Sequence, residues 1–161
     1  MAEETKSYEG IRGWLILPLI GLFIVPIRIA ILALKDLVPI FTKGYWNSLT
    51  TPGSAAYHPL WAPLIIFECV GNTVFAVSAI VLLVFFFRKS RLLPRLMISY
   101  LILNLLFVAS DLFFANLIPS VAEQSQLEDY KELARAIIGA IVWVPYFWVS
   151  KRVKQTFVRW G

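Results

Sequence analysis

The stretch FIVPIRIAIL (residues 23–32) decides the fold, because one charged residue, Arg28, stands in it among apolar side chains. The apolar run extends on both sides, over about residues 14–37. A run longer than about 18 apolar residues is typical of a helix that crosses a bilayer. Arg28 is therefore expected inside the hydrocarbon layer, where a charged side chain needs a partner or water.

The composition of the whole chain agrees with a membrane location. Its 161 residues are 59% hydrophobic and only 16% charged, and the mean hydropathy is +0.74. Soluble domains carry about 25% charged residues. We therefore predict one integral membrane domain over residues 1–161. The single cysteine, Cys69, excludes an internal disulfide and a cysteine metal site.

Four apolar segments predict the architecture. They cover about residues 14–37, 60–87, 92–118 and 134–150, and each approaches or exceeds the roughly 20 residues that a spanning helix needs. The predicted fold class is an all-α integral membrane protein with four transmembrane helices, a four-helix bundle. Pro18, Pro26 and Pro145 lie inside these segments and predict kinked helices.

The charges between the segments predict an orientation. The link between the second and third segments and the C-terminal tail hold eight basic residues and no acid: Arg88, Lys89, Arg91, Arg95, Lys151, Arg152, Lys154 and Arg159. Acidic residues gather instead in the link between the third and fourth segments. Cytoplasmic loops carry the excess of Lys and Arg, so both termini are predicted to be cytoplasmic. The basic residues are expected to contact anionic lipid headgroups, and nucleic acid is not an expected partner.

The basic tail itself allows two interpretations. Val153, Phe157 and Trp160 recur on one helical face, which is typical of a last helix that continues and lies against the headgroups. A short solvated basic tail, which only sets the topology, explains the same charges.

Two acids inside the apolar segments are the candidate partners of Arg28. Glu68 and Asp111 stand at a similar depth to Arg28 when about 1.5 Å of rise is counted for each residue. Asn72 follows Glu68 by one helical turn and Asn104 precedes Asp111 by two turns, so each acid shares a face with an amide. This set is predicted to form an intramembrane polar network.

The predicted network contains two acids and one arginine, so one carboxyl group has no arginine to pair with. That carboxyl is either protonated or paired with Lys35 or Arg135 near the ends of helices. A network that only fixes helix register is one interpretation, and a carboxyl that carries a proton or holds a cation is the other. Gly21, seven residues before Arg28, is expected to let a neighbouring helix approach closely.

Motifs for chemistry are not found. The only histidine, His58, stands beside a proline and is expected in a turn, which leaves no histidine metal site. The sequence holds no phosphate-binding loop, no nucleophile elbow and no dinucleotide fingerprint. We therefore expect no enzyme activity, no metal and no cofactor.

Four stretches together carry a resemblance to a known family. They are GIRGWLILP (10–18), TPGSAAYHPLWAPL (51–64), FECVGN (67–72) and VPYFWVSKRVKQTF (144–157). Over about residues 10–159 the chain resembles the bacterial inner-membrane family named domain of unknown function 2569. The resemblance implies a multi-pass protein of the bacterial cytoplasmic membrane with four helices, and it brings no assigned activity and no catalytic residues.

Two functional hypotheses of different classes follow. The first is a noncatalytic accessory or assembly subunit, which works as a homo-oligomer or within a larger membrane complex. The alternative is a small transporter or channel that uses Glu68 and Asp111 with Arg28. A membrane enzyme acting on lipid is a third and weaker hypothesis.

Overall fold

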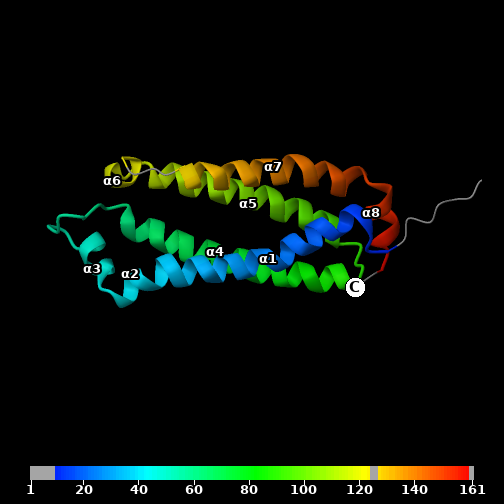
Figure 1. The fold of residues 1–161 in the computed structure, drawn as a ribbon, viewed down its shortest axis with the longest axis horizontal. Helices are drawn as coiled ribbons and strands as arrows, with labels where there is room; N and C mark the ends of the chain where they lie inside the picture. The colour runs from blue at the N-terminus through cyan, green and yellow to red at the C-terminus, as the bar shows by residue number, and fades with distance from the viewer. Residues whose placement is uncertain (1–9, 124–126, 160–161) are drawn as a thin grey trace, which may run out of the picture.

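In a computed structural model, which describes residues 10–123 and 127–159, the chain is built from four long helices (Figure 1). These are α1 (Ile16–Leu32), α4 (Trp61–Phe87), α5 (Leu93–Ala115) and α7 (Leu127–Val149). A 3-10 turn, η1 (Gly13–Leu15), precedes α1, and a π-helical turn, η2 (Ala33–Leu37), joins it to α2 (Val38–Thr42). The remaining helices are short: α3 (Tyr45–Thr50), α6 (Pro119–Ala122) and α8 (Lys151–Thr156).

The four predicted spans are confirmed as helices long and apolar enough to cross a membrane. They run over Gly13–Thr42, Trp61–Phe87, Leu93–Ala115 and Tyr130–Val149. Two of these helical stretches extend beyond the predicted segments. The first helical stretch continues past residue 37 to Thr42, and α7 begins at Leu127 rather than near residue 134. The polar residues at the start of α7 have the composition of a loop, yet they form the first turns of a helix.

The long helices contain two kinds of feature that can disturb a regular α-helix, namely prolines and a π-helical turn. Pro26 and Pro145 lie inside α1 and α7, and kinks there stay a prediction. Pro18 lies in the first turn of α1, where a missing amide costs nothing within the helix. The π-helical turn, which the sequence pattern does not predict, adds a residue to the helical register. It carries Lys35 and Asp36.

The long helices pack in chain order. Helix α1 packs against α4, α4 against α5, and α5 against α7, which gives two layers, α5 with α7 and α1 with α4 (Figure 1). Helices α1 and α7 are thus the two ends of a series. We call the end of the molecule with α8 the α8 end, and the end with α2, α3 and α6 the α3 end (Figure 1).

Both ends of the described chain lie at the α8 end. The Thr156 hydroxyl donates to the carbonyl of Gly10 at 3.3 Å, and the Arg152 guanidinium donates to the carbonyl of Arg12 at 3.2 Å. Four spans return the chain to the side on which it started. These contacts between the two terminal segments therefore fit an even number of spans.

The core is also concentrated at the α8 end. Leu15 in η1 and Phe86, Leu93 and Phe147 on α4, α5 and α7 are at most 2% exposed. At the α3 end few side chains are buried, among them Ile118. The bundle is therefore closed firmly at one end and packed loosely at the other.

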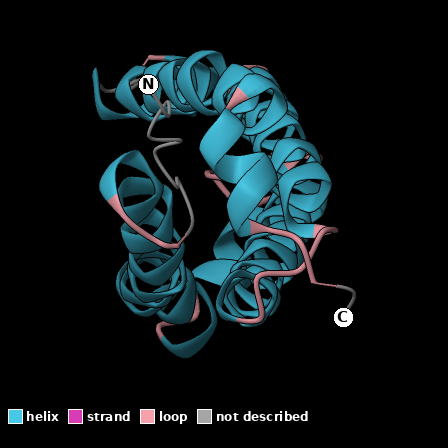
Figure 2. Cartoon of the chain, turned by 90° about the vertical axis from the view of Figure 1, so that its right-hand side faces the viewer, coloured by secondary structure: helices cyan, strands magenta, loops and turns pink. Residues whose placement is uncertain are grey.

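Helix α8 closes the core, and this corrects the expectation that the last long helix continues into the tail. Contact of the basic residues of the tail with headgroups stays a prediction. The helical path breaks at Ser150, whose ψ is 122° and whose hydroxyl accepts a hydrogen bond from the Val153 amide. The chain then turns across the end of the bundle that faces the viewer in Figure 2, and Val153 and Phe157 are 0% and 4% exposed. The apolar face of the tail thus packs on protein, neither on headgroups nor in water. Trp160, the third residue of that face, lies outside the described residues.

Helices α4 and α5 meet through aromatic rings. The ring centroid of Phe107 lies 4.8 Å from that of Phe67 and 5.2 Å from that of Phe75, and Phe75 also meets Tyr100 at 5.5 Å. Gly71 lies between the two phenylalanines of α4, where a Cβ would overlap the Phe107 ring. The missing side chain at Gly71 makes this close approach possible.

Candidate functional site

Arg28 forms an ion pair with Glu132, which is a different partner from the two acids considered in the sequence analysis. The guanidinium of Arg28, on α1, donates to the carboxylate of Glu132, on α7. The pair therefore joins the two end helices of the series. The side chains are 43% and 40% exposed, so the pair is not enclosed by this chain alone.

The extension of α7 explains why the sequence did not reveal Glu132. It stands among several charged residues that resemble a connecting loop, and the fourth helix was expected to begin after it. In the structure Glu132 is in the second turn of α7, inside the candidate span Tyr130–Val149. One signal was available: Glu132, Gly139 and Trp143 recur at spacings of seven and four residues, which is one face of a helix.

Glu68 lies among other acids. The carboxyl groups of Asp111, Asp36 and Glu132 lie close enough to Glu68 to interact with it electrostatically. The four acids come from four parts of the fold, namely the π-helical turn, α4, α5 and α7. Asp36 was not singled out from the sequence, because it stands near the end of the first apolar segment. No three of the described His, Cys, Asp or Glu side chains are placed to hold one metal ion.

The other predicted members of the polar network are placed as follows. Asn72 on α4 and Asn104 on α5 are half-buried, while Lys35 and Arg135 are exposed. A single network joining Arg28 to Glu68, Asp111 and the two amides stays a prediction. A Cβ built at Gly21 meets no described atom within 4 Å. No described helix of the same chain therefore packs closely on that glycine, and a close approach by another helix stays a prediction.

His58 lies in the turn before α4, as expected from its neighbouring proline. Its Nδ1 atom accepts a hydrogen bond from the backbone amide of Leu60 at 3.3 Å. The ring therefore has a local structural role in ending the loop and starting α4.

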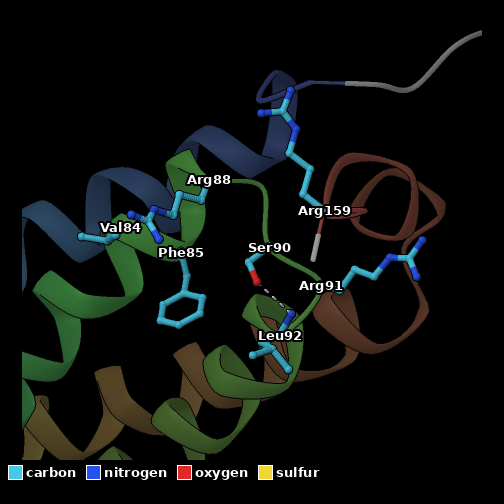
Figure 3. Close-up of a pocket in the computed structure, with 7 residues that line it drawn as sticks. All are labelled: Val84, Phe85, Arg88, Ser90, Arg91, Leu92 and Arg159. Carbon is cyan, nitrogen blue, oxygen red and sulfur yellow. Dashed lines mark hydrogen bonds between the residues drawn. The ribbon is translucent and has the colours of Figure 1, made fainter. Parts of the chain in front are cut away.

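The predicted basic residues at the α8 end divide into three groups. Arg88, Arg91 and Arg159 line a hollow of about 390 Å³ together with Val84, Phe85, Ser90 and Leu92 (Figure 3). Lys151 and Arg152 line a second hollow of about 310 Å³ with Gly13, Trp14, Tyr146 and Ser150. Lys89, Arg95 and Lys154 line neither hollow.

Backbone hydrogen bonds attach the end of the described chain to the turn between α4 and α5. The Arg91 amide donates to the Arg159 carbonyl at 2.9 Å, and the Arg159 amide donates to the Lys89 carbonyl at 3.1 Å. Arg91 Nε also donates to the Val158 carbonyl at 2.6 Å. The first hollow is therefore formed by two segments far apart in sequence, and its shape depends on both.

The fold defines a class of protein: a multi-pass membrane protein with four candidate spanning helices. Within that class, the family model described as Protein of unknown function (DUF2569) matches residues 8–158. The match covers nearly the whole chain, so the protein belongs to this family, as its sequence motifs indicate. The chain shows no significant match to a curated protein or to a solved structure.

Proposed function

We propose that this protein is a noncatalytic subunit of the bacterial inner membrane that assembles through the surface where α1 and α7 lie side by side at the Arg28–Glu132 pair. The partner is a second copy of the chain or a larger membrane complex. In this proposal both termini are cytoplasmic, because the basic residues gather at the α8 end.

The exposure of the Arg28–Glu132 pair is the observation that carries the proposal. Both residues belong to candidate membrane spans, yet each side chain is at least 40% exposed in the single chain. Charged side chains at membrane depth face protein or a water-filled space, since contact with hydrocarbon is costly. A partner helix that packs on α1 and α7 would cover the Arg28–Glu132 pair.

The packing of the same two helices supports the proposal. A Cβ built at Gly21 on α1 or at Gly139 on α7 meets no described atom within 4 Å. Small residues let membrane helices approach closely, and association there depends on packing because lipid and Leu are equally apolar. Each of the two end helices, α1 and α7, therefore has a glycine on which no other described helix of the chain packs closely.

Native mass spectrometry of the protein, gently extracted from its own membrane at its normal level, tests the proposal. A homo-oligomer or a stoichiometric foreign subunit is the expected result, and an isolated monomer at all gentle conditions would contradict it. Cross-linking adds the position. With Cys69 replaced by Ala, Gly139→Cys should cross-link in intact membranes faster than Leu103→Cys, a control on the exposed face of α5.

A small transporter or channel is the second candidate, and the acids around Glu68 favour it. Acids inside a membrane bundle are costly and mark ion or proton pathways in many membrane proteins. The four acids and Arg28 would then line a path that an oligomer completes. Proteoliposomes should show a pH-dependent flux that is lost in Glu68→Gln and in Asp111→Asn. Absence of any flux, with assembly intact, would leave the subunit proposal alone.

A further inference from the structure

We propose that the first hollow at the α8 end, which we call the arginine hollow, is a binding site for one anionic phospholipid. Val84, Phe85, Arg88, Ser90, Arg91, Leu92 and Arg159 form it. The site takes a phosphate-bearing headgroup at its rim and the start of an acyl chain on its apolar wall. This inference is independent of the proposed assembly through α1 and α7, which lies elsewhere on the chain.

The charge of the hollow selects an anion. Its lining contains three arginines and no acidic residue. In Figure 3 the three guanidinium groups lie on different sides of the hollow and point in different directions. Arg91 is engaged with the Val158 carbonyl, so we assign the headgroup contacts to Arg88 and Arg159. Their long side chains can turn toward one anion at the mouth, and guanidinium groups match the geometry of phosphate.

The apolar wall selects a lipid over a soluble phosphate. In Figure 3, Phe85 and Leu92 lie opposite to the guanidinium group of Arg159, whereas the guanidinium group of Arg88 lies on the same side as Val84 and Phe85. Val84 and Leu92 are 48% and 49% exposed, which leaves apolar surface open beside the charges. Inorganic phosphate has no apolar part that could pack on this wall, whereas the glycerol backbone and acyl chains of a phospholipid would cover it.

The position of the hollow matches the depth of lipid headgroups. It lies where α4 ends at Phe87 and α5 begins at Leu93, between two candidate spans. The 27 residues of α4 extend over about 40 Å, which is longer than the roughly 30 Å hydrocarbon layer. A helix of that length extends beyond the hydrocarbon layer, and the basic residues that follow Phe87 favour the headgroup region for this end of α4.

Lipid retention by the purified full-length protein tests this inference. Native mass spectrometry would compare retained phosphatidylglycerol and phosphatidylcholine with identical acyl chains, added as an equimolar mixture. We expect the wild type to prefer phosphatidylglycerol, and Arg88→Gln with Arg159→Gln to weaken that preference by roughly 25-fold. That figure corresponds to about fivefold for each charge lost near an anionic headgroup.

Two matched double variants make the result specific to the hollow. Arg95→Gln with Lys154→Gln removes two charges from the same end of the molecule but from outside the hollow, and should change the preference by less than about twofold because exposed charges are screened. Arg88→Lys with Arg159→Lys keeps both charges and should retain most of the preference.

Three results would each overturn the inference. They are equal retention of the two lipids by the wild type, an equal loss in the Arg95/Lys154 variant, and displacement of the lipid by millimolar inorganic phosphate. The first and third need no variant, so a failure of the Gln variant to fold does not protect the inference. The oligomeric state, read in the same spectra, reports separately on the proposed assembly.

Discussion

The ring of Phe107 on α5 lies over Gly71 on α4, so that a Cβ at residue 71 would overlap its edge. Phe67 and Phe75 flank the same ring one helical turn to either side. Helix packing in a membrane depends on such close fits, because apolar burial alone does not distinguish a helix from lipid. The contact therefore sets the distance between the two central helices of the series.

Gly71→Ala should destabilise the protein. The added methyl group must displace the Phe107 ring or push α4 from α5, which costs about 1–3 kcal/mol for an overpacked contact. Thermal unfolding in detergent, followed by loss of helical circular dichroism, would measure the change.

Gly139→Ala is the matched control for Gly71→Ala. Its Cβ would meet no described atom within 4 Å, and Ala is the better helix former by about 1 kcal/mol. In the detergent-solubilised monomer, where the proposed partner at Gly139 is absent, it should leave stability equal or raised. The double variant Gly71→Ala with Phe107→Leu should recover part of the loss. If Gly71→Ala is as stable as Gly139→Ala, the close contact does not set the helix spacing.

Neutralising one member of the Arg28–Glu132 pair should reduce accumulation in the membrane more than neutralising both. Arg28→Ala leaves a carboxylate at membrane depth without its counter-ion, and an unpaired charge is more costly than no pair at all. The expected coupling energy is about 1–3 kcal/mol, since each side chain is only partly buried. A double-mutant cycle with Glu132→Ala, read as folded protein per cell, measures it.

The same cycle separates Glu132 from the acids proposed from the sequence. Arg28→Ala should be rescued better by Glu132→Ala than by Glu68→Gln with Asp111→Asn. Better rescue by the Glu68 and Asp111 changes would instead support the network predicted from sequence and contradict Glu132 as the main partner of Arg28.

Phe157→Ala should open the α8 end. The Phe157 ring meets Phe86 edge to face with 5.2 Å between centroids, and the side chain is 4% exposed. Truncating a buried phenylalanine typically costs about 3–5 kcal/mol. Val158→Ala is the control, because Val158 is 45% exposed and should change stability by less than about 0.5 kcal/mol. Equal melting temperatures for the two variants would show that α8 does not close the core.

The spans could be predicted from sequence because the bilayer imposes their length. The second span was expected over residues 60–87 and is observed at Trp61–Phe87. The partner of Arg28 could not be predicted, since the depth of a residue does not say which helix stands beside it. Glu68 and Asp111 have suitable depths, and Glu68 even lies on α4, which packs against α1, yet Arg28 pairs with Glu132 on α7 at the other end of the series.

The path of the tail was equally open. Val153 and Phe157 share a helical face whether α7 continues or breaks, so their spacing alone cannot distinguish the two. The break depends on Ser150, whose hydroxyl caps α8, and on the space that the core leaves beneath the bundle. Only the arrangement of all four helices shows that this space exists.

Lys89→Gly should stabilise the turn that carries the arginine hollow. Lys89 has φ of 53°, and it is the one non-glycine residue with positive φ among those described. A left-handed conformation costs an L side chain roughly 1–2 kcal/mol, while glycine loses more entropy on folding. The net gain should be about 0.5–1 kcal/mol. Lys89→Ala removes the same charge but keeps the Cβ, so it should not share the gain.

Because Lys89 lies outside the lining of the hollow, Lys89→Gly should also keep the preference for phosphatidylglycerol. A loss of that preference together with a gain in stability would place Lys89, rather than Arg88 and Arg159, at the headgroup.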